Sequence, residues 1–241
     1  MPSDVRFRAV FFDFGGTLFS YHRFRERFDR LLVDTARRHG VEAPADELRQ
    51  TYITAILPVM REYVTRPFYY HRDMFGDLGA AYLRALGADP DPESRARFYT
   101  GQTEVASPLI EAREGAVETL QGLRAAGLHI GVVSNIDNDQ FEVLWERCGL
   151  APLVDAVTTS EDARSCKPDS AIYRAALDKA DGPSPQEVIF VGDSLHQDVA
   201  GANPLGMSSV LIGSEPPEPD GPIQPTHVIS DLRELLDIVR G

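Results

Sequence analysis

The 241-residue chain has few lysines and few cysteines. Among its 24 basic residues only Lys167 and Lys179 are lysine, so few side chains can serve where an amine is required. Cys148 and Cys166 are too few to form a disulfide framework. We therefore expect a reducing, cytoplasmic environment.

Positive charge and long apolar segments are also scarce. The formal net charge of −13 argues against nucleic acid and anionic membranes as partners, because both bind basic surfaces. No apolar run approaches the ~18 residues of a membrane span, and no long apolar segment follows Met1 as a secretion signal would. The negative net charge is still compatible with a small anionic substrate, because a bound cation can make the electrostatic potential inside a cleft positive. We expect a monomer or a homodimer.

Strands and helices are predicted to alternate over most of the chain. Short apolar runs predict strands at residues 7–13, 128–133, 153–158, 187–191, 208–212 and 226–229. Between them, helical spacing of apolar residues predicts helices at 115–126, 140–148, 169–179, through Val199, and at 231–239. This alternation is typical of the α/β class, with a Rossmann-like, doubly wound parallel sheet covered on both faces.

A long helical segment interrupts this alternation after the first predicted strand. Residues 20–105 have apolar side chains at helical spacing and no convincing strand. We therefore expect a core formed by residues 1–18 and 108–241, with a helical domain inserted at residues 19–107.

Polar residues follow several of the predicted strands. Asp13, Ser134 and Asp193 each stand where a strand ends, and Lys167 lies on the loop after the third strand. The carboxyl ends of parallel strands meet at one edge of the sheet, which is where ligands bind. An acid, a hydroxyl, an amine and a second acid at this edge indicate an active site.

Four segments carry a resemblance to a known family. They are Asp13-Phe14-Gly15-Gly16-Thr17-Leu18, Val132-Val133-Ser134-Asn135, Cys166-Lys167-Pro168-Asp169 and Val191-Gly192-Asp193-Ser194, the last followed by Asp198. In this order they resemble the four motifs of the haloacid dehalogenase-like (HAD) hydrolase superfamily. The helical insert resembles the C1 cap of that superfamily's subfamily I.

The resemblance implies a Mg²⁺-dependent phosphatase that acts on a small phosphorylated metabolite. Asp13 would be the nucleophile and would form an aspartyl-phosphate, and Lys167 would neutralise charge on Asp13 and on the phosphoryl group. The residues implied to contact the phosphoryl group are Gly16, Thr17, Ser134, Asn135 and Lys167. The ligands implied for Mg²⁺ are Asp13, the Gly15 carbonyl, Asp193 and Asp198, the last as a ligand or as an acid behind the ligands.

The chain departs from the family pattern at Gly15. Phosphatases of the family have an aspartate there that protonates the leaving oxygen and then activates water. Its loss costs about 10²–10⁴-fold in rate unless something compensates. The substrate could have a good leaving group, another residue could substitute, or the protein could bind phosphorylated ligands with slow turnover. The candidate substitutes are His196, His22, Tyr21 and His71.

Other branches of the superfamily also lack this acid. Phosphonatases use a cap lysine, and residues 18–112 contain none. Haloacid dehalogenases need no metal and typically lack the acid equivalent to Asp193, so Asp193 favours phosphoryl chemistry. A dehalogenase therefore stays the alternative enzyme. The other alternative is a weakly catalytic protein that binds phosphorylated metabolites.

Within the insert, residues 66–72 combine cations and aromatic rings. These side chains could bind an organic anion, or they could pack the cap's own helices.

Overall fold

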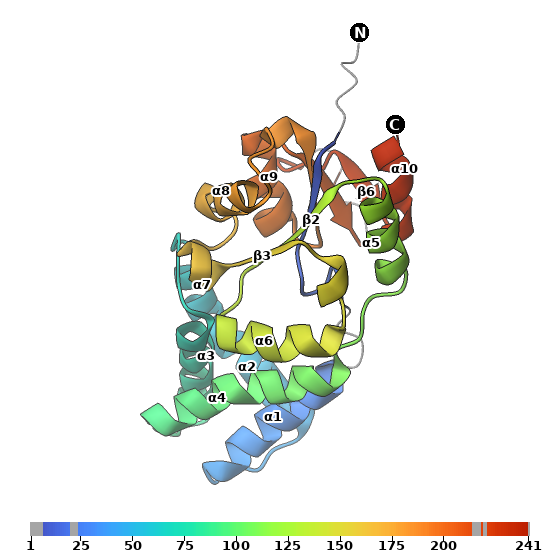
Figure 1. Ribbon diagram of the computed structural model, residues 1–241. Coiled ribbons are helices and arrows are strands. Elements are labelled where there is room, and N and C mark those ends of the chain that lie inside the picture. The colour runs from blue at the N-terminus through green and yellow to red at the C-terminus, as the bar shows by residue number, and fades with distance from the viewer. Residues whose placement is uncertain (1–6, 20–23, 214–217, 219–220, 241) are drawn as a thin grey trace.

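The computed structural model describes residues 7–19, 24–213, 218 and 221–240 (Figure 1). Within these residues a single six-stranded sheet has the order β3-β2-β1-β4-β5-β6, and all neighbouring strands are parallel. The strands are β1 (Ala9–Phe12), β2 (His129–Ser134), β3 (Ala156–Thr159), β4 (Val188–Gly192), β5 (Ser208–Ile212) and β6 (His227–Ile229). The predicted α/β fold with a doubly wound parallel sheet is therefore confirmed.

Helices cover both faces of the sheet because its central strands are apolar on both sides. In β1, Val10 and Phe12 pack on one face, in a cluster with apolar residues of α5 (Ala116–Ala125), α6 (Asn138–Cys148) and α10 (Leu235–Arg240). Phe11 packs on the other face with residues of α8 (Ser170–Lys179) and α9 (Ala200–Ala202). Burial on both faces is why β1 is a continuous apolar run.

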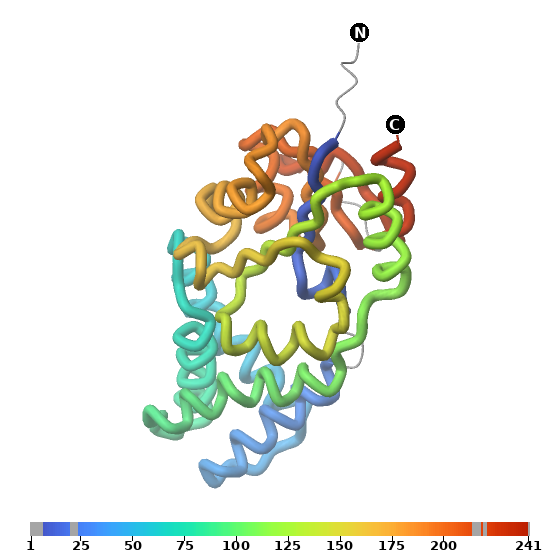
Figure 2. The backbone as a smooth tube through the Cα atoms, in the orientation of Figure 1, coloured from blue at the N-terminus to red at the C-terminus, as the bar shows by residue number. Residues whose placement is uncertain are grey.

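Four long helices form a separate layer beyond the carboxyl ends of the strands (Figure 1). They are α1 (Phe24–Arg38), α2 (Ala45–Tyr63), α3 (His71–Ala85) and α4 (Pro92–Ala106). Each contributes to a hydrophobic cluster of their own, which includes Leu32, Tyr52, Tyr82 and Phe98. Figure 2 shows the chain entering this layer after β1 and returning to the sheet region through α5.

Several element boundaries differ from the predicted ones. The third strand begins at Ala156 instead of residue 153, because Ala151–Leu153 forms a 3₁₀ turn that contains Pro152. The predicted final helix is divided into a 3₁₀ turn over Leu232–Glu234 and the helix α10. The helix expected through Val199 is a π-helical turn, Leu195–Val199, followed by α9.

No helix among the described residues combines the length and apolar character that would let it cross a membrane.

Candidate active site

Asp13 lies at the centre of the carboxyl edge of the sheet. Its strand, β1, pairs with β2 on one side and with β4 on the other. The Asp13 backbone N–H donates to the Val191 carbonyl at 2.8 Å, which extends the pairing with β4 by one residue. Asp13 therefore lies between Ser134 at the end of β2 and Asp193 just after β4, and this edge faces the four-helix layer (Figure 1).

Lys167 joins two buried acids of this edge. Its Nζ donates to Asp13 Oδ1 at 2.6 Å and to Asp198 Oδ1 at 2.7 Å. All three residues are buried, with 4% of Lys167, 7% of Asp13 and 2% of Asp198 exposed. Burial alone lowers the pKa of Lys167, but the two carboxylates more than offset it and raise that pKa above its usual range. Lys167 is therefore a cation fixed beside Asp13.

Burial also changes the ionisation of Asp13. It raises the pKa of Asp13 to about 7, because the stabilising charge of Lys167 is outweighed by burial together with the charges of Asp198 and Asp193. Asp193 is an exposed residue, but partial desolvation of its carboxylate and the charge of Asp198 still raise its pKa. The arrangement therefore holds more negative charge than one ammonium neutralises.

The three acids are close enough to share a cation. One carboxylate oxygen from each of Asp13, Asp193 and Asp198 lies within 4.8 Å of the others. Hard carboxylate oxygens with excess negative charge suit a divalent cation such as Mg²⁺. The Asp198 oxygens are already hydrogen-bonded, one to Lys167 and the other to the Ser194 backbone N–H at 2.9 Å. The donor set therefore fits a divalent ion best at Asp13 and Asp193.

Gly16 lets the loop after β1 approach Asp193. Its φ of +84° is in the left-handed region, and a Cβ placed on it would lie 2.0 Å from Asp193 Oδ2. Any larger residue would displace either the loop or the acid. The glycine at position 16 is thus required by the geometry of the acidic cluster.

The hydroxyl of Thr17 is a buried polar atom to which the described residues provide no hydrogen-bond partner. Thr17 itself is fully buried. Buried polar groups are almost always hydrogen-bonded in proteins, so the free hydroxyl is consistent with a ligand or a water at this position.

Arg113 holds the same loop through its backbone carbonyls, and sequence reasoning missed it. Its side chain donates to the carbonyls of Gly16 and Thr17, the latter at 2.8 Å, and its backbone N–H donates to the Leu18 carbonyl at 2.7 Å. Arg113 lies outside the four motifs, and nothing in its local sequence distinguishes it from the other arginines.

Asn135 and Ser134 have different surroundings although they are adjacent. Ser134 ends β2, and only 5% of it is exposed. Asn135 Oδ1 accepts from the Lys167 backbone N–H at 2.7 Å, and its Nδ2 donates to the Lys167 carbonyl at 3.0 Å. The Asn135 amide thus positions Lys167, and its expected contact with a phosphoryl group stays a prediction.

The candidate substitutes for an acid at position 15 lie in different places. Tyr21 and His22 are outside the described residues. His196 is exposed on the π-helical turn. His71 lines a cavity of about 140 Å³ together with Gly15 and Ser134. Burial and the charge of Lys167 lower the pKa of His71 to about 4.

The segment of residues 66–72 contacts the core. Asp137, which is fully buried, accepts from the backbone N–H groups of His71 and Arg72 at 2.7 and 2.8 Å. The Arg72 guanidinium pairs with Asp137 and with Glu161 at 3.3 Å. In addition, the Cys166 N–H donates to the Pro67 carbonyl at 2.7 Å. These contacts join the start of α3 to the loops that follow β2 and β3.

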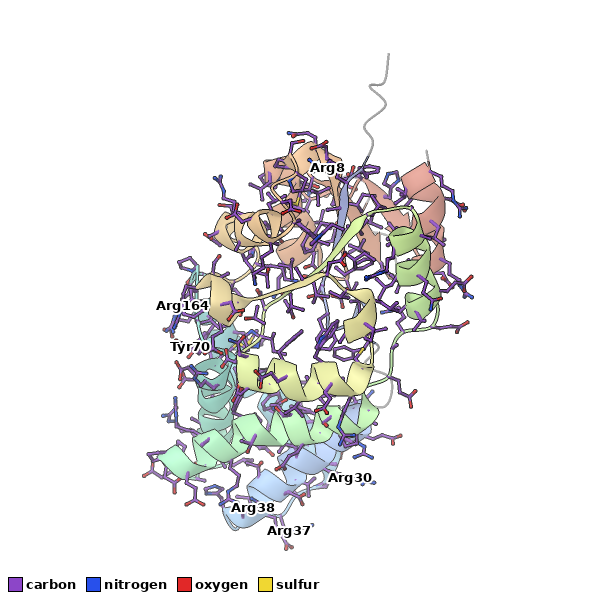
Figure 3. The ribbon with its side chains drawn as sticks, viewed as in Figure 1. Arg8, Arg30, Arg37, Arg38, Tyr70 and Arg164 are labelled. Carbon is purple, nitrogen blue, oxygen red and sulfur yellow. The ribbon has the colours of Figure 1, made fainter. Side chains whose placement is uncertain are left out.

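Aromatic rings and a second arginine accompany this junction. Figure 3 labels Tyr70 and Arg164, which are hydrogen-bonded to each other where the helical layer meets the core. The Arg72 guanidinium lies 3.8 Å from the centre of the Tyr70 ring. Cations and rings of this segment therefore bind the two layers to each other, a role that sequence reasoning did not consider.

Comparison with known proteins agrees with this geometry. The family model for haloacid dehalogenase-like hydrolases matches residues 7–206. A glyceraldehyde 3-phosphate phosphatase of Methanopyrus kandleri is 30% identical over 240 residues, which cover 97% of each chain. The pyrimidine 5'-nucleotidase YjjG of Escherichia coli is 27% identical over 230 residues, which cover 95% of this chain and 96% of that protein.

Solved structures show the same fold. The magnesium-bound HAD-hydrolase YfnB of Bacillus subtilis superposes with a TM-score of 0.78 at 20% identity, over 98% of this chain and all of that one. The match to the family model, the near-complete coverage of the relatives and the shared fold lead to one conclusion: the chain belongs to the haloacid dehalogenase-like hydrolases.

Proposed function

We propose that this HAD hydrolase is a Mg²⁺-dependent phosphatase that acts on a small phosphorylated metabolite through a phosphorylated Asp13. The observation that carries the proposal is the buried arrangement of Asp13, Lys167 and Asp198, with Asp193 beside it. Similarity to two enzymes named as phosphatase and nucleotidase supports phosphoryl chemistry.

Each residue of the arrangement has a proposed task. Mg²⁺, held by Asp13, Asp193 and the Gly15 carbonyl, would supply positive charge for the phosphoryl oxygens. Asp198, in contact with Lys167 and the Ser194 backbone, acts as the acid that orients Lys167 more than as a ligand. The hydroxyls of Thr17 and Ser134 and the backbone of Gly16 bind phosphoryl oxygens, and Asn135 fixes the loop of Lys167.

The reaction has two displacements. In the first, an Asp13 carboxylate oxygen attacks phosphorus, the bond to the leaving oxygen breaks, and an aspartyl-phosphate forms. In the second, water attacks phosphorus and the carboxylate of Asp13 is regenerated. Lys167 stays charged throughout and stabilises the negative charge of both transition states, which is how proteins accelerate phosphoryl transfer.

The four-helix layer serves in this proposal as a C1-type cap of residues 19–107 over a core of residues 1–18 and 108–241. The layer faces the carboxyl edge of the sheet that carries Asp13 (Figure 1). A cap in this place excludes water from the site and contacts the part of the substrate that leaves.

A screen of phosphate release tests the proposal. Acyl, aryl and alkyl phosphates would be supplied with Mg²⁺ and, separately, with a chelator. We expect release only with Mg²⁺, and none from Asp13→Asn. The matched control is Asp178→Asn, which changes an exposed acid on α8 and should retain full activity. Full activity of Asp13→Asn would refute the nucleophile.

Two alternatives predict other outcomes of the same screen. A dehalogenase would release halide from a 2-haloacid without metal. A phosphometabolite-binding protein would be stabilised against heat by its ligand and yet release no phosphate, even from acyl phosphates.

A further inference from the structure

Two residues that line the cavity beside Gly15 each have a buried polar atom without a partner among the described residues. These atoms are Nε2 of His71, at the start of α3, and Nε2 of Gln102, in α4. Gln102 is only 5% exposed. Buried polar atoms are almost always hydrogen-bonded, so two without partners on the lining of one small cavity point to a group that binds there during function. Ser134, at the carboxyl edge of the sheet, lines the same cavity.

Neighbouring groups hold the imidazole of His71 in place. The Tyr69 ring is stacked on it at 5.6 Å between centres, and the Phe75 ring meets it edge-on at 5.7 Å. Its backbone N–H is fixed by Asp137 at 2.7 Å. The ring is therefore positioned before any substrate arrives, as a catalytic group must be.

The surroundings also determine the charge of His71. The charged or titratable groups around it are Lys167, Asp137, Tyr69 and Arg72. Burial and Lys167 keep the pKa of His71 at about 4, so the ring is neutral at pH 7 and retains a lone pair. A neutral imidazole can accept a proton but has none to spare as an acid.

Resting on the proposed function, we propose that His71 is the base that activates water in the second displacement, in place of the carboxylate missing at position 15. The water oxygen attacks phosphorus of the aspartyl-phosphate as one of the water protons moves to His71. The bond between phosphorus and the Asp13 oxygen breaks, and its electron pair returns to the carboxylate. The imidazolium then releases the proton to solvent.

This assignment also restricts the substrate. In the first displacement neither Gly15 nor neutral His71 protonates the leaving oxygen, which therefore departs with its electron pair as an anion. Only a weakly basic leaving group does so readily, which points to acyl, aryl or enol phosphates. The cavity supplies apolar walls from Phe14, Phe75 and Leu144 for the leaving group. The Gln102 amide provides a donor for an oxygen on it.

The test separates the two displacements by rapid mixing with an aryl phosphate. For His71→Gln we expect the burst of released phenol to persist, while steady-state phosphate release falls by about 10²–10⁴-fold and phosphorylated Asp13 accumulates. The matched control is His227→Gln, an exposed histidine of β6, which should behave as the wild type. Added imidazole should restore turnover to His71→Ala, which a folding defect would not allow.

Three results would overturn the assignment. They are wild-type turnover of His71→Gln, loss of the burst together with turnover, or no rescue by imidazole. If His196→Gln instead traps the phosphorylated enzyme, the base is His196. A different result would contradict the proposed function itself. In that case the wild type would show neither a burst nor phosphate release with any leaving group.

Discussion

The Lys167 ammonium and the Asp13 carboxylate lie 2.6 Å apart although 154 positions separate the two residues in the sequence. The same ammonium contacts Asp198, so both buried carboxylates at the carboxyl edge of the sheet depend on one side chain. Removing one charge from such a buried group leaves the remaining charges without compensation. The resulting loss of stability is far larger than the loss when a surface ion pair is broken.

Lys167→Met should therefore reduce both stability and activity. We expect the free energy of unfolding in urea to fall by about 3–5 kcal/mol and phosphate release to fall by about 10²–10³-fold. Lys179, the only other lysine, is the matched control: it is exposed, pairs with Asp162 at 3.9 Å and donates to the Val157 carbonyl. Lys179→Met should change the stability by less than about 1 kcal/mol. Equal effects of the two substitutions would contradict the role of Lys167.

Gly16→Ala tests the close approach to Asp193. A matched control is Gly40→Ala, because Gly40 has a similar φ of +77° and nothing within 4 Å of a built Cβ. Both substitutions carry the cost of left-handed backbone, about 1 kcal/mol. We expect only Gly16→Ala to weaken Mg²⁺ binding, by at least about tenfold, because it displaces Asp193, the proposed ligand. Calorimetric titration with Mg²⁺ measures this, and unchanged affinity would count against Asp193 as a ligand.

Asp137→Asn tests the junction between α3 and the core. An amide keeps the shape but has only one oxygen to accept the two N–H groups of His71 and Arg72. We expect the free energy of unfolding to fall by about 1–3 kcal/mol. Hydrogen exchange at His71 and Arg72 should accelerate, and exchange in β1 should not. Asp178→Asn is again the control, and unchanged exchange at the start of α3 would show that Asp137 does not hold it.

His71 should make stability depend on pH. Its folded pKa of about 4 lies below that of the unfolded chain, so the unfolded state binds more protons between about pH 6.5 and pH 4. The stability of the wild type should therefore fall as the pH is lowered through this window. The measurement is urea unfolding with a chelator present. Across this pH window the free energy of unfolding should fall by on the order of 2 kcal/mol more for the wild type than for His71→Gln. Parallel pH profiles would contradict a neutral His71 in the folded protein.

Features of the fold that depend on neighbouring residues in the sequence could be predicted. Apolar runs that end in Asp13, Ser134 and Asp193 predicted strands whose carboxyl ends meet, and the parallel sheet confirms this fold. Helical spacing predicted the four-helix insert as helical, and the structure has α1–α4 there. The expected domain limits at residues 18/19 and 107/108 stay predictions.

Contacts between distant segments had no such signal. Arg113 and Asp137 act through the backbones of Gly16 and His71, and nothing in their neighbouring sequence shows which backbone groups they meet. For the same reason the segment of residues 66–72 could be recognised as rich in cations and rings, but its attachment to the core could not be predicted. Position 15 was different, because the sequence itself shows that the carboxylate is missing there. Among the candidate substitutes that the structure describes, His71 lines the cavity with Gly15 and His196 does not.

The most direct test of the account is to look for a phosphoryl group on Asp13. The protein would be mixed with an acyl phosphate and Mg²⁺, quenched in acid within one turnover, digested, and examined by mass spectrometry. We predict one phosphoryl group on the peptide that contains Asp13, absent when a chelator is added and absent in Asp13→Asn. Phosphate release from the wild type with no modification of Asp13 at any time point would contradict the account.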